Sequence, residues 1–357
     1  MYILGLGTAT PPRRYTQTEC WAAFQASPQF PELTARSHTI LETILLGKNG
    51  ITSRCLALDS LKEAFDLHPD TLHRRFARHA PILAAEAAWR ALRDADQQAD
   101  DIEAVIISTC TGYLCPGLTS YVAESLGLRR DVLALDLVGQ GCGAALPNLR
   151  MAEALLAADR CRSVLSICVE VCSAAFYLDN DPGVLVSACL FGDGAGAAVL
   201  AREPHGKNRR IQWITSGSAL IPAERDTLRF EQRHGILRNV LKRSVPTVAA
   251  THAEAVLDEV LSKAGVSRSE IRTWIWHAGG RDVLDAVQER LALSPDDLQW
   301  SRAVLNEYGN LSSAFVYFVL QDAVRKHATG GRWWLSSFGA GFSCHGALLE
   351  VSEVRTS

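Results

Sequence analysis

The chain has 357 residues, of which 48% are hydrophobic and 21% charged, an ordinary composition for a globular protein with a large buried core. A formal net charge of -3 provides no basic surface of the kind that binds nucleic acid, so we exclude that class of function. The ten cysteines form no C-x-x-C pair, which argues against structural zinc and for reduced cysteines in a cytoplasmic protein.

The first residues, MYILGLGTATPP, contain no basic residue ahead of an apolar run, so we expect a strand and a loop rather than a signal peptide. The longest apolar region, residues 164–178, is interrupted by Glu170. It is too short for a membrane span, which needs about 20 apolar residues. We therefore expect a soluble protein without a membrane span.

Apolar runs typical of strands alternate with segments of helical period along the chain. The expected elements of the first part are a helix at 82–95, strands at 102–109 and 132–137, a helix at 143–158 that Pro147 distorts, and strands at 163–169 and 195–201. Those of the second part are a helix at 248–264, a strand at 274–276, a helix at 281–291, a helix from Asn310 to about His327, and strands at 333–337 and 346–351. This alternation predicts an α/β fold of two similar layered halves, residues 1–205 and 206–357, with the boundary in the polar stretch REPHGKNRR near His205.

The first reactive side chain is Cys142, in the segment GQGCGAA between a predicted strand and a predicted helix. A thiol at a helix N-terminus lies near free N–H groups and the positive end of the dipole, which lowers a cysteine pKa from about 8.5 to about 3.5–7.5. The flanking glycines let a substrate carbonyl approach the backbone closely. This segment alone supports a nucleophile and a small buried residue about equally.

Two further segments, WIWHAGG around His277 and EYGNLSSAF around Asn310, present polar side chains among small residues. His277 either pairs with the thiol and donates to an oxyanion, or is a core histidine whose ring nitrogens are hydrogen-bonded within the protein. Asn310 either caps a helix or stabilises an enolate as an uncharged donor. Phe191, ahead of a Gly-Asp-Gly turn, is either a core residue or one wall of a pocket.

Read in order, the segments GQGCGAA, LFGDGAGAA, WIWHAGGRDVLDAV and LNEYGNLSSA resemble the type III polyketide synthases, the chalcone synthase-like enzymes, here of bacterial type. The resemblance extends from GLGTATPP near the start to SFGAGF near the end. It implies a thiolase-like αβαβα fold and a catalytic set of Cys142, His277 and Asn310. A rival group, the initiating ketoacyl-acyl carrier protein synthases, has the same three residue types, but its histidine precedes Gln-Ala-Asn rather than the Ala-Gly-Gly present here.

The resemblance also implies the reaction. Cys142 takes an acyl starter from coenzyme A, malonyl-CoA loses CO2, and an enolate held by His277 and Asn310 attacks the thioester. Repeated rounds and a cyclisation give a pyrone, a resorcinol or another phenolic product. The resemblance implies no metal and no bound cofactor. It does imply a homodimer. The alternative function is a single condensation or acyl transfer, as in ketoacyl-acyl carrier protein synthase III.

The substrate-binding residues implied by the resemblance are Phe191, Lys48, Cys110, Thr111, Cys115, Cys172, Ser312, Phe338 and Gly339. In family dimers the residue at the position of Cys115 reaches the partner's cavity. Cys172 replaces a threonine of the plant enzymes, and a cysteine at this position is similar to the one in bacterial tetrahydroxynaphthalene synthases. The loop Ser-Phe-Gly-Ala-Gly at 337–341 lacks the usual proline, which implies a looser loop.

Basic residues at the expected coenzyme A tunnel are only partly retained. Lys48 matches one of them, whereas Leu41 and Ile44 occupy two other basic positions. Arg54, or the basic residues within 238–243, are candidate replacements or solvated surface charges. Asn239 falls near the position of a second gatekeeper phenylalanine.

Overall fold

The computed structural model describes residues 1–204 and 209–352, so the predicted boundary near His205 lies outside the described residues. The α-helices are α1 (Gln17–Gln25), α2 (Ala35–Leu46), α3 (Pro69–Asp94), α4 (Leu118–Leu126), α5 (Ala145–Ala157), α6 (Pro182–Leu190), α7 (Val245–Ala264), α8 (Arg281–Leu291), α9 (Gln299–Tyr308) and α10 (Phe315–Arg325). The strands are β1 (Tyr2–Ala9), β2 (Arg14–Thr16), β3 (Ser53–Cys55), β4 (Ala104–Ser108), β5 (Leu133–Leu137), β6 (Ser163–Glu170), β7 (Gly194–Ala201), β8 (Arg210–Leu220), β9 (Leu228–Arg233), β10 (Ile236–Leu241), β11 (Ile271–Trp276), β12 (Gly331–Gly339) and β13 (Ser343–Ser352).

Nine of these strands form one sheet in the order β11-β12-β13-β8-β1-β7-β6-β4-β5. Its two ends repeat one topology. On one side β4 runs parallel to β6, which is antiparallel to β7, and β7 is antiparallel to β1. On the other side β11 runs parallel to β12, which is antiparallel to β13, and β13 is antiparallel to β8. The predicted α/β fold with similar layered halves is therefore confirmed.

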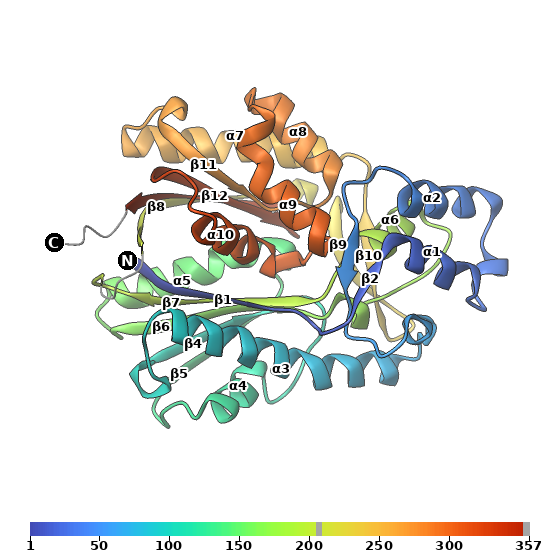
Figure 1. Ribbon diagram of the computed structural model, residues 1–357, viewed down its shortest axis with the longest axis horizontal. Coiled ribbons are helices and arrows are strands. Elements are labelled where there is room, and N and C mark those ends of the chain that lie inside the picture. The colour runs from blue at the N-terminus through green and yellow to red at the C-terminus, as the bar shows by residue number, and fades with distance from the viewer. Residues whose placement is uncertain (205–208, 353–357) are drawn as a thin grey trace.

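The helices divide into layers around these strands (Figure 1). Helices α7 and α8 cover the strands of the second half, α3 and α4 cover those of the first half, and α5 and α10 lie between the two sets of strands. Eight of the eleven residues of α10 are buried, as expected for a helix with sheet on both sides. The central position of α5 and α10 matters because Cys142 and Asn310 lie just ahead of these two helices.

Most predicted elements are confirmed, and α8 has the predicted bounds. The helix predicted from Asn310 is present as α10, but its predicted start at Asn310 is wrong. Gly309 adopts φ +71, and Asn310 forms an isolated bridge with Phe191, so the chain is extended there. A 3-10 turn, Ser312–Ala314, then precedes α10. The helix expected from residue 143 begins at Ala145, and Pro147 lies in its first turn, where a backbone N–H has no intrahelical partner to lose.

The residues at the two ends of the sheet differ in exposure. β11 is buried except for Arg272, whereas β5 shows exposed and half-buried residues along its length. Within 1–204 and 209–352, no helix combines the length and hydrophobicity needed to cross a bilayer.

Candidate active site

Three segments that are distant in sequence meet at Ser312. Cys142 lies in the 3-10 turn Gly141–Gly143 between β5 and α5, and the Ser312 hydroxyl lies 3.3 Å from its Sγ. The backbone N–H of Ser312 donates to Oδ1 of Asn310 at 2.8 Å. The Asn310 amide in turn donates through Nδ2 to the carbonyl of Gly279 at 3.2 Å, two residues after His277. The thiol, the carboxamide and the histidine loop are thus joined by successive contacts.

His277 follows β11 directly, and its backbone N–H donates to the Ser336 carbonyl at 2.9 Å. Its ring makes edge contacts with Phe315 and Phe338, with centroids 5.5 and 5.0 Å away. Neither ring nitrogen has a hydrogen-bond partner among the described residues. Burial in this apolar environment lowers the pKa of His277 to about 3, so the imidazole is neutral at physiological pH.

Glycines bring the Cys142 turn against the end of β12. A Cβ at Gly143 would lie only 3.0 Å from the backbone nitrogen of Gly339. The Ser337 hydroxyl donates to the Gly143 carbonyl at 2.9 Å and ties the two segments together. Because Phe338 packs on the His277 ring, the same contact holds the Cys142 turn close to the histidine.

The thiol of Cys142 does not have the lowered pKa expected from its position ahead of a helix. Burial raises its pKa to about 12, against the stabilising contacts of the thiolate with Ser312 and with its own backbone N–H. The dipole expectation was wrong because removing the thiolate from water costs more than these contacts return. In this structure the sulfur and the imidazole are both neutral.

Glu170 is a buried site residue that sequence reasoning missed. Its carboxylate accepts hydrogen bonds from Thr111 Oγ1 at 2.9 Å and from the Cys110 N–H at 3.1 Å, and it also contacts Ser313 Oγ. Ser312 Oγ lies 3.2 Å from the same carboxylate, and its single proton goes either to Glu170 or to Cys142 Sγ. Burial raises the pKa of this carboxyl group. The carboxyl thus holds the hydroxyl that touches Cys142. A lone acidic residue in an apolar strand was the available signal, and it was used only to argue against a membrane span.

Two cavities adjoin these residues. Phe191, Cys172, Thr111 and Ser312 line the first, whose space, counted together with the open solvent at its mouth, is about 820 Å³. Cys110 and Thr111 line the second, whose space counted in the same way is about 1320 Å³. Phe191 also pairs with Asn310 in the isolated bridge, so the wall of the first cavity is attached to the polar cluster.

The other residues implied by the resemblance lie away from these cavities. Phe338 is buried against His277, and Gly339 contacts the Cys142 turn. Lys48 and Cys115 are exposed, and neither lines the two cavities. The Lys48 carbonyl accepts a hydrogen bond from Arg281, the first residue of α8.

Arg54, a candidate coenzyme A ligand or solvated surface charge, is not a surface charge: it is buried and lines the first cavity. Its side chain is buried and donates to the carbonyls of Ala188 and Phe191, at 2.9 and 2.8 Å, and to Gln17. The Nε and Nη1 groups of this guanidinium bind other groups of the protein, so Arg54 fixes the wall that carries Phe191. In the described part of the chain, no group of three or more His, Cys, Asp or Glu side chains is arranged to hold a metal ion.

A buried cysteine is linked through Ser312 to an asparagine, and the amide of that asparagine contacts the loop after a neutral, buried histidine. This arrangement is typical of a condensing enzyme of the thiolase-like class. The sequence profile of the chalcone and stilbene synthases matches with its N-terminal domain at residues 2–204 and its C-terminal domain at residues 214–351. The chain is 30% identical, over 98% of its length and 89% of the relative's, to a 3,5-dihydroxyphenylacetyl-CoA synthase of Streptomyces toyocaensis.

Solved structures agree. PKS-I from the brown alga Ectocarpus siliculosus has a TM-score of 0.89 and 26% identity, covering 98% of this chain and 97% of its own. The 1,3,6,8-tetrahydroxynaphthalene synthase of Streptomyces coelicolor A3(2), a bacterial type III polyketide synthase, has a TM-score of 0.87 and 25% identity, covering 99% and 100%. The chain belongs to the chalcone and stilbene synthase family. It is a type III polyketide synthase, a transferase that catalyses decarboxylative condensation, and the carrier-protein alternative is not favoured.

Proposed function

We propose that Cys142 is the nucleophile that carries the acyl chain and that His277 and Asn310 act on the thioester carbonyls. The single observation that carries this assignment is the chain of contacts from Cys142 Sγ through Ser312 and Asn310 to the loop after His277. A thiol, an uncharged imidazole and a carboxamide are the groups that thioester condensation requires.

The thiol is activated only when substrate arrives. With a thiol pKa of about 12 and an imidazole pKa of about 3, the resting pair is uncharged. An incoming thioester brings a carbonyl whose developing oxyanion accepts hydrogen bonds, and the thiol proton moves to the unpartnered ring nitrogen of His277 as the sulfur attacks. Coenzyme A thiol leaves with that proton, and the acyl group stays on Cys142.

The condensation uses the same neutral donors. After malonyl-CoA loses CO2, the enolate oxygen receives hydrogen bonds from His277 and from Nδ2 of Asn310, which now faces the Gly279 carbonyl. Neutral donors stabilise the enolate without neutralising it, so the carbanion carbon remains able to attack the Cys142 thioester.

The substrates we propose are an acyl-CoA starter and malonyl-CoA, and the product is a pyrone, a resorcinol or another phenolic ring. Two relatives support a polyhydroxylated aromatic product, because one is named for 3,5-dihydroxyphenylacetyl-CoA and the other for 1,3,6,8-tetrahydroxynaphthalene. The two adjoining cavities, which share Thr111, supply room for the starter and for the growing chain. The reaction as proposed draws on no bound cofactor.

We further propose a cytoplasmic homodimer. β5 is the last strand of the sheet, yet Leu133 on it is 42% exposed, and Val138 and Tyr113 nearby are 58% and 69% exposed. An apolar sheet edge of this kind calls for a partner strand, and a second copy supplies an identical one. Val138 and Tyr113 also line the second cavity, which the second copy would close. All ten cysteines are free thiols, which supports a reducing compartment.

The test combines malonyl-CoA with a panel of acyl-CoA starters and follows CO2 release and product masses. Wild-type protein is expected to give pyrones or phenols, and Cys142→Ala none. A folded wild-type protein that releases no CO2 with any starter contradicts the proposed function. A Cys142→Ala protein with unchanged product formation contradicts the assignment of Cys142 as the nucleophile.

A further inference from the structure

The hairpin β9–β10 forms one wall of the first cavity. Phe230 on β9 and Asn239 on β10 face each other in the strand register, and both line this cavity. Three phenylalanines of other elements, Phe24, Phe65 and Phe176, line it as well. Asn239 is therefore a buried amide in a space lined mainly by apolar side chains, several of them aromatic, where an unused polar group is costly.

The orientation of the Asn239 amide follows from its contact with Ser187 on α6. The Ser187 hydroxyl donates its only proton to the Gly183 carbonyl at 2.7 Å, so toward Asn239 it can only accept. Asn239 Nδ2 donates to that oxygen at 2.7 Å. The amide oxygen is the remaining group. This oxygen has no hydrogen-bond partner among the described residues, and protein atoms do not enclose it completely. It is therefore open to the cavity that Asn239 lines.

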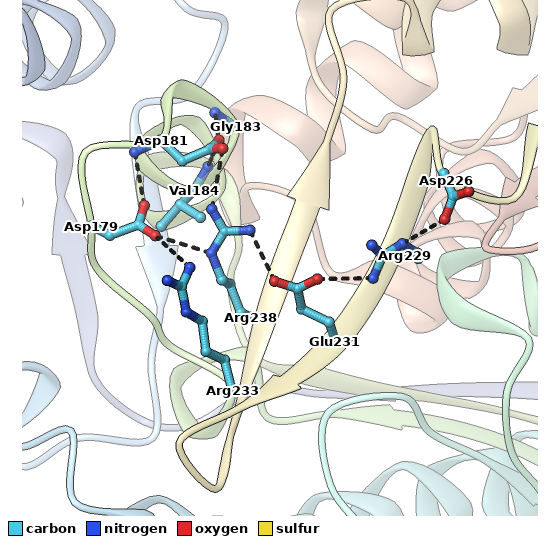
Figure 2. Close-up of polar contacts among 9 residues, drawn as sticks. All are labelled: Asp179, Asp181, Gly183, Val184, Asp226, Arg229, Glu231, Arg233 and Arg238. Carbon is cyan, nitrogen blue, oxygen red and sulfur yellow. Dashed lines mark hydrogen bonds and ion pairs between the residues drawn. The ribbon is translucent and has the colours of Figure 1, made fainter.

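The neighbouring residue, Arg238, forms ion pairs on the other face of the hairpin. Successive residues of a strand point to opposite faces, so Arg238 points away from the cavity while Asn239 points into it. Its guanidinium contacts Asp179 at 3.0 Å, Asp181 at 3.1 Å and Glu231 at 3.3 Å (Figure 2). The Arg238 side chain is only 9% exposed, so this cluster is screened much less than a surface ion pair.

The cluster also connects the hairpin to α6. Asp181 caps α6 by accepting hydrogen bonds from the backbone N–H groups of Gly183 and Val184 (Figure 2). Arg238 thus holds the start of the helix that carries Ser187, while the next residue of β10 bonds to Ser187 itself. The amide of Asn239 and the hydroxyl that orients it are fixed by one assembly of charges.

We propose that Asn239 is a specificity-determining residue whose amide oxygen accepts a hydrogen bond from a hydroxyl group on an aromatic acyl starter held in the first cavity. Arg238 is a positioning residue that keeps this oxygen aimed at the ring. The inference deepens the proposed function and rests on it. A site that hydrogen-bonds a substrate hydroxyl discriminates against the analogue that lacks it, because the buried acceptor is then left unpaired.

The experiment compares phenylacetyl-CoA with its 3-hydroxy and 4-hydroxy counterparts as starters, in the presence of malonyl-CoA. For the wild-type protein we expect kcat/KM to favour one hydroxylated ester by about tenfold. Asn239→Leu, which keeps the side-chain size and removes the acceptor, should bring that ratio to about one. An unchanged ratio in Asn239→Leu, or no preference in the wild type, overturns the proposal.

Two arginine variants separate positioning from folding. Arg238→Met should weaken the preference, mainly through KM of the hydroxylated ester, with kcat for the plain ester nearly retained. Arg233→Met is the matched control on the same hairpin, because Arg233 is 51% exposed and its one ion pair within 1–204 and 209–352 is with Asp179, at 4.0 Å. It should keep the wild-type ratio. Equal effects of the two variants contradict the positioning role.

Calorimetry measures how tightly the same esters bind to Cys142→Ala protein, with and without Asn239→Leu. It reports discrimination between the hydroxylated and plain esters in the absence of turnover. If a hydroxylated ester binds more tightly than the plain ester, and Asn239→Leu removes this difference, the role of Asn239 is supported. This holds even if wild-type protein forms no polyketide, because a lack of polyketide contradicts only the proposed function. Equal binding of the hydroxylated and plain esters contradicts the role of Asn239, whatever the activity.

Discussion

Replacing His277 by leucine removes a buried neutral base and should change how stability depends on pH. Burial lowers the pKa of His277 in the folded protein to about 3, whereas the unfolded chain has the ordinary value of 6.5. The unfolded state therefore binds this proton first as the pH falls. The contribution to stability is complete above about pH 6.5 and is lost as the pH falls toward 3.

The magnitude follows from the two pKa values. Each pH unit below 6.5 costs the folded state about 1.4 kcal/mol, so wild-type protein should lose about 2 kcal/mol between pH 6.5 and pH 5 through this group alone. In His277→Leu this loss is absent. The full difference of 6.5 − 3 = 3.5 units corresponds to about 5 kcal/mol at the acid limit, an order-of-magnitude figure.

The assay is urea unfolding of both proteins at several pH values between 7 and 5, at one protein concentration because association shifts apparent stability. All other titrating groups are common to both proteins, so the difference between the two curves isolates His277. Two curves that run parallel across this range would refute the view that the imidazole is buried and neutral.

Two further predictions concern the carboxyl network and the sheet edge. Glu170→Gln should lower kcat by about tenfold or more with a small change in KM, because the Ser312 hydroxyl beside Cys142 loses a strong acceptor; steady-state kinetics that match the wild type contradict this role. Leu133→Lys should shift the protein from dimer to monomer in sedimentation velocity, since a charge on the exposed edge strand opposes pairing with a second copy; a persistent dimer argues that another surface forms the interface.

The sequence predicted the layered fold well because it depends on patterns that a linear chain displays. The apolar run of β6 and the helical period of α8 are local features, and both elements lie where expected. The order of strands in the sheet, with β1 between β7 and β8, joins residues far apart in sequence, and no local pattern encodes it.

The site was predicted less completely, for physical reasons. Cys142, His277 and Asn310 were singled out by their glycine-rich surroundings, but their ionisation was not. A helix N-terminus suggested a thiolate, whereas burial, which only the fold determines, gives a neutral thiol. Glu170 gave a weak signal. Arg54 could not be told from a surface charge in the sequence, whereas in the fold it is buried against backbone carbonyls of α6 and Phe191.

The most direct test of the account is to find where the acyl group is carried. Protein mixed with an acyl-CoA starter alone is quenched in acid, digested and examined by mass spectrometry. We predict the mass of one acyl group on the peptide that contains Cys142, appearing more slowly in His277→Ala. An acyl group on the peptide of Cys110 or Cys172 instead, or protein that stays unmodified with every starter, would contradict the account.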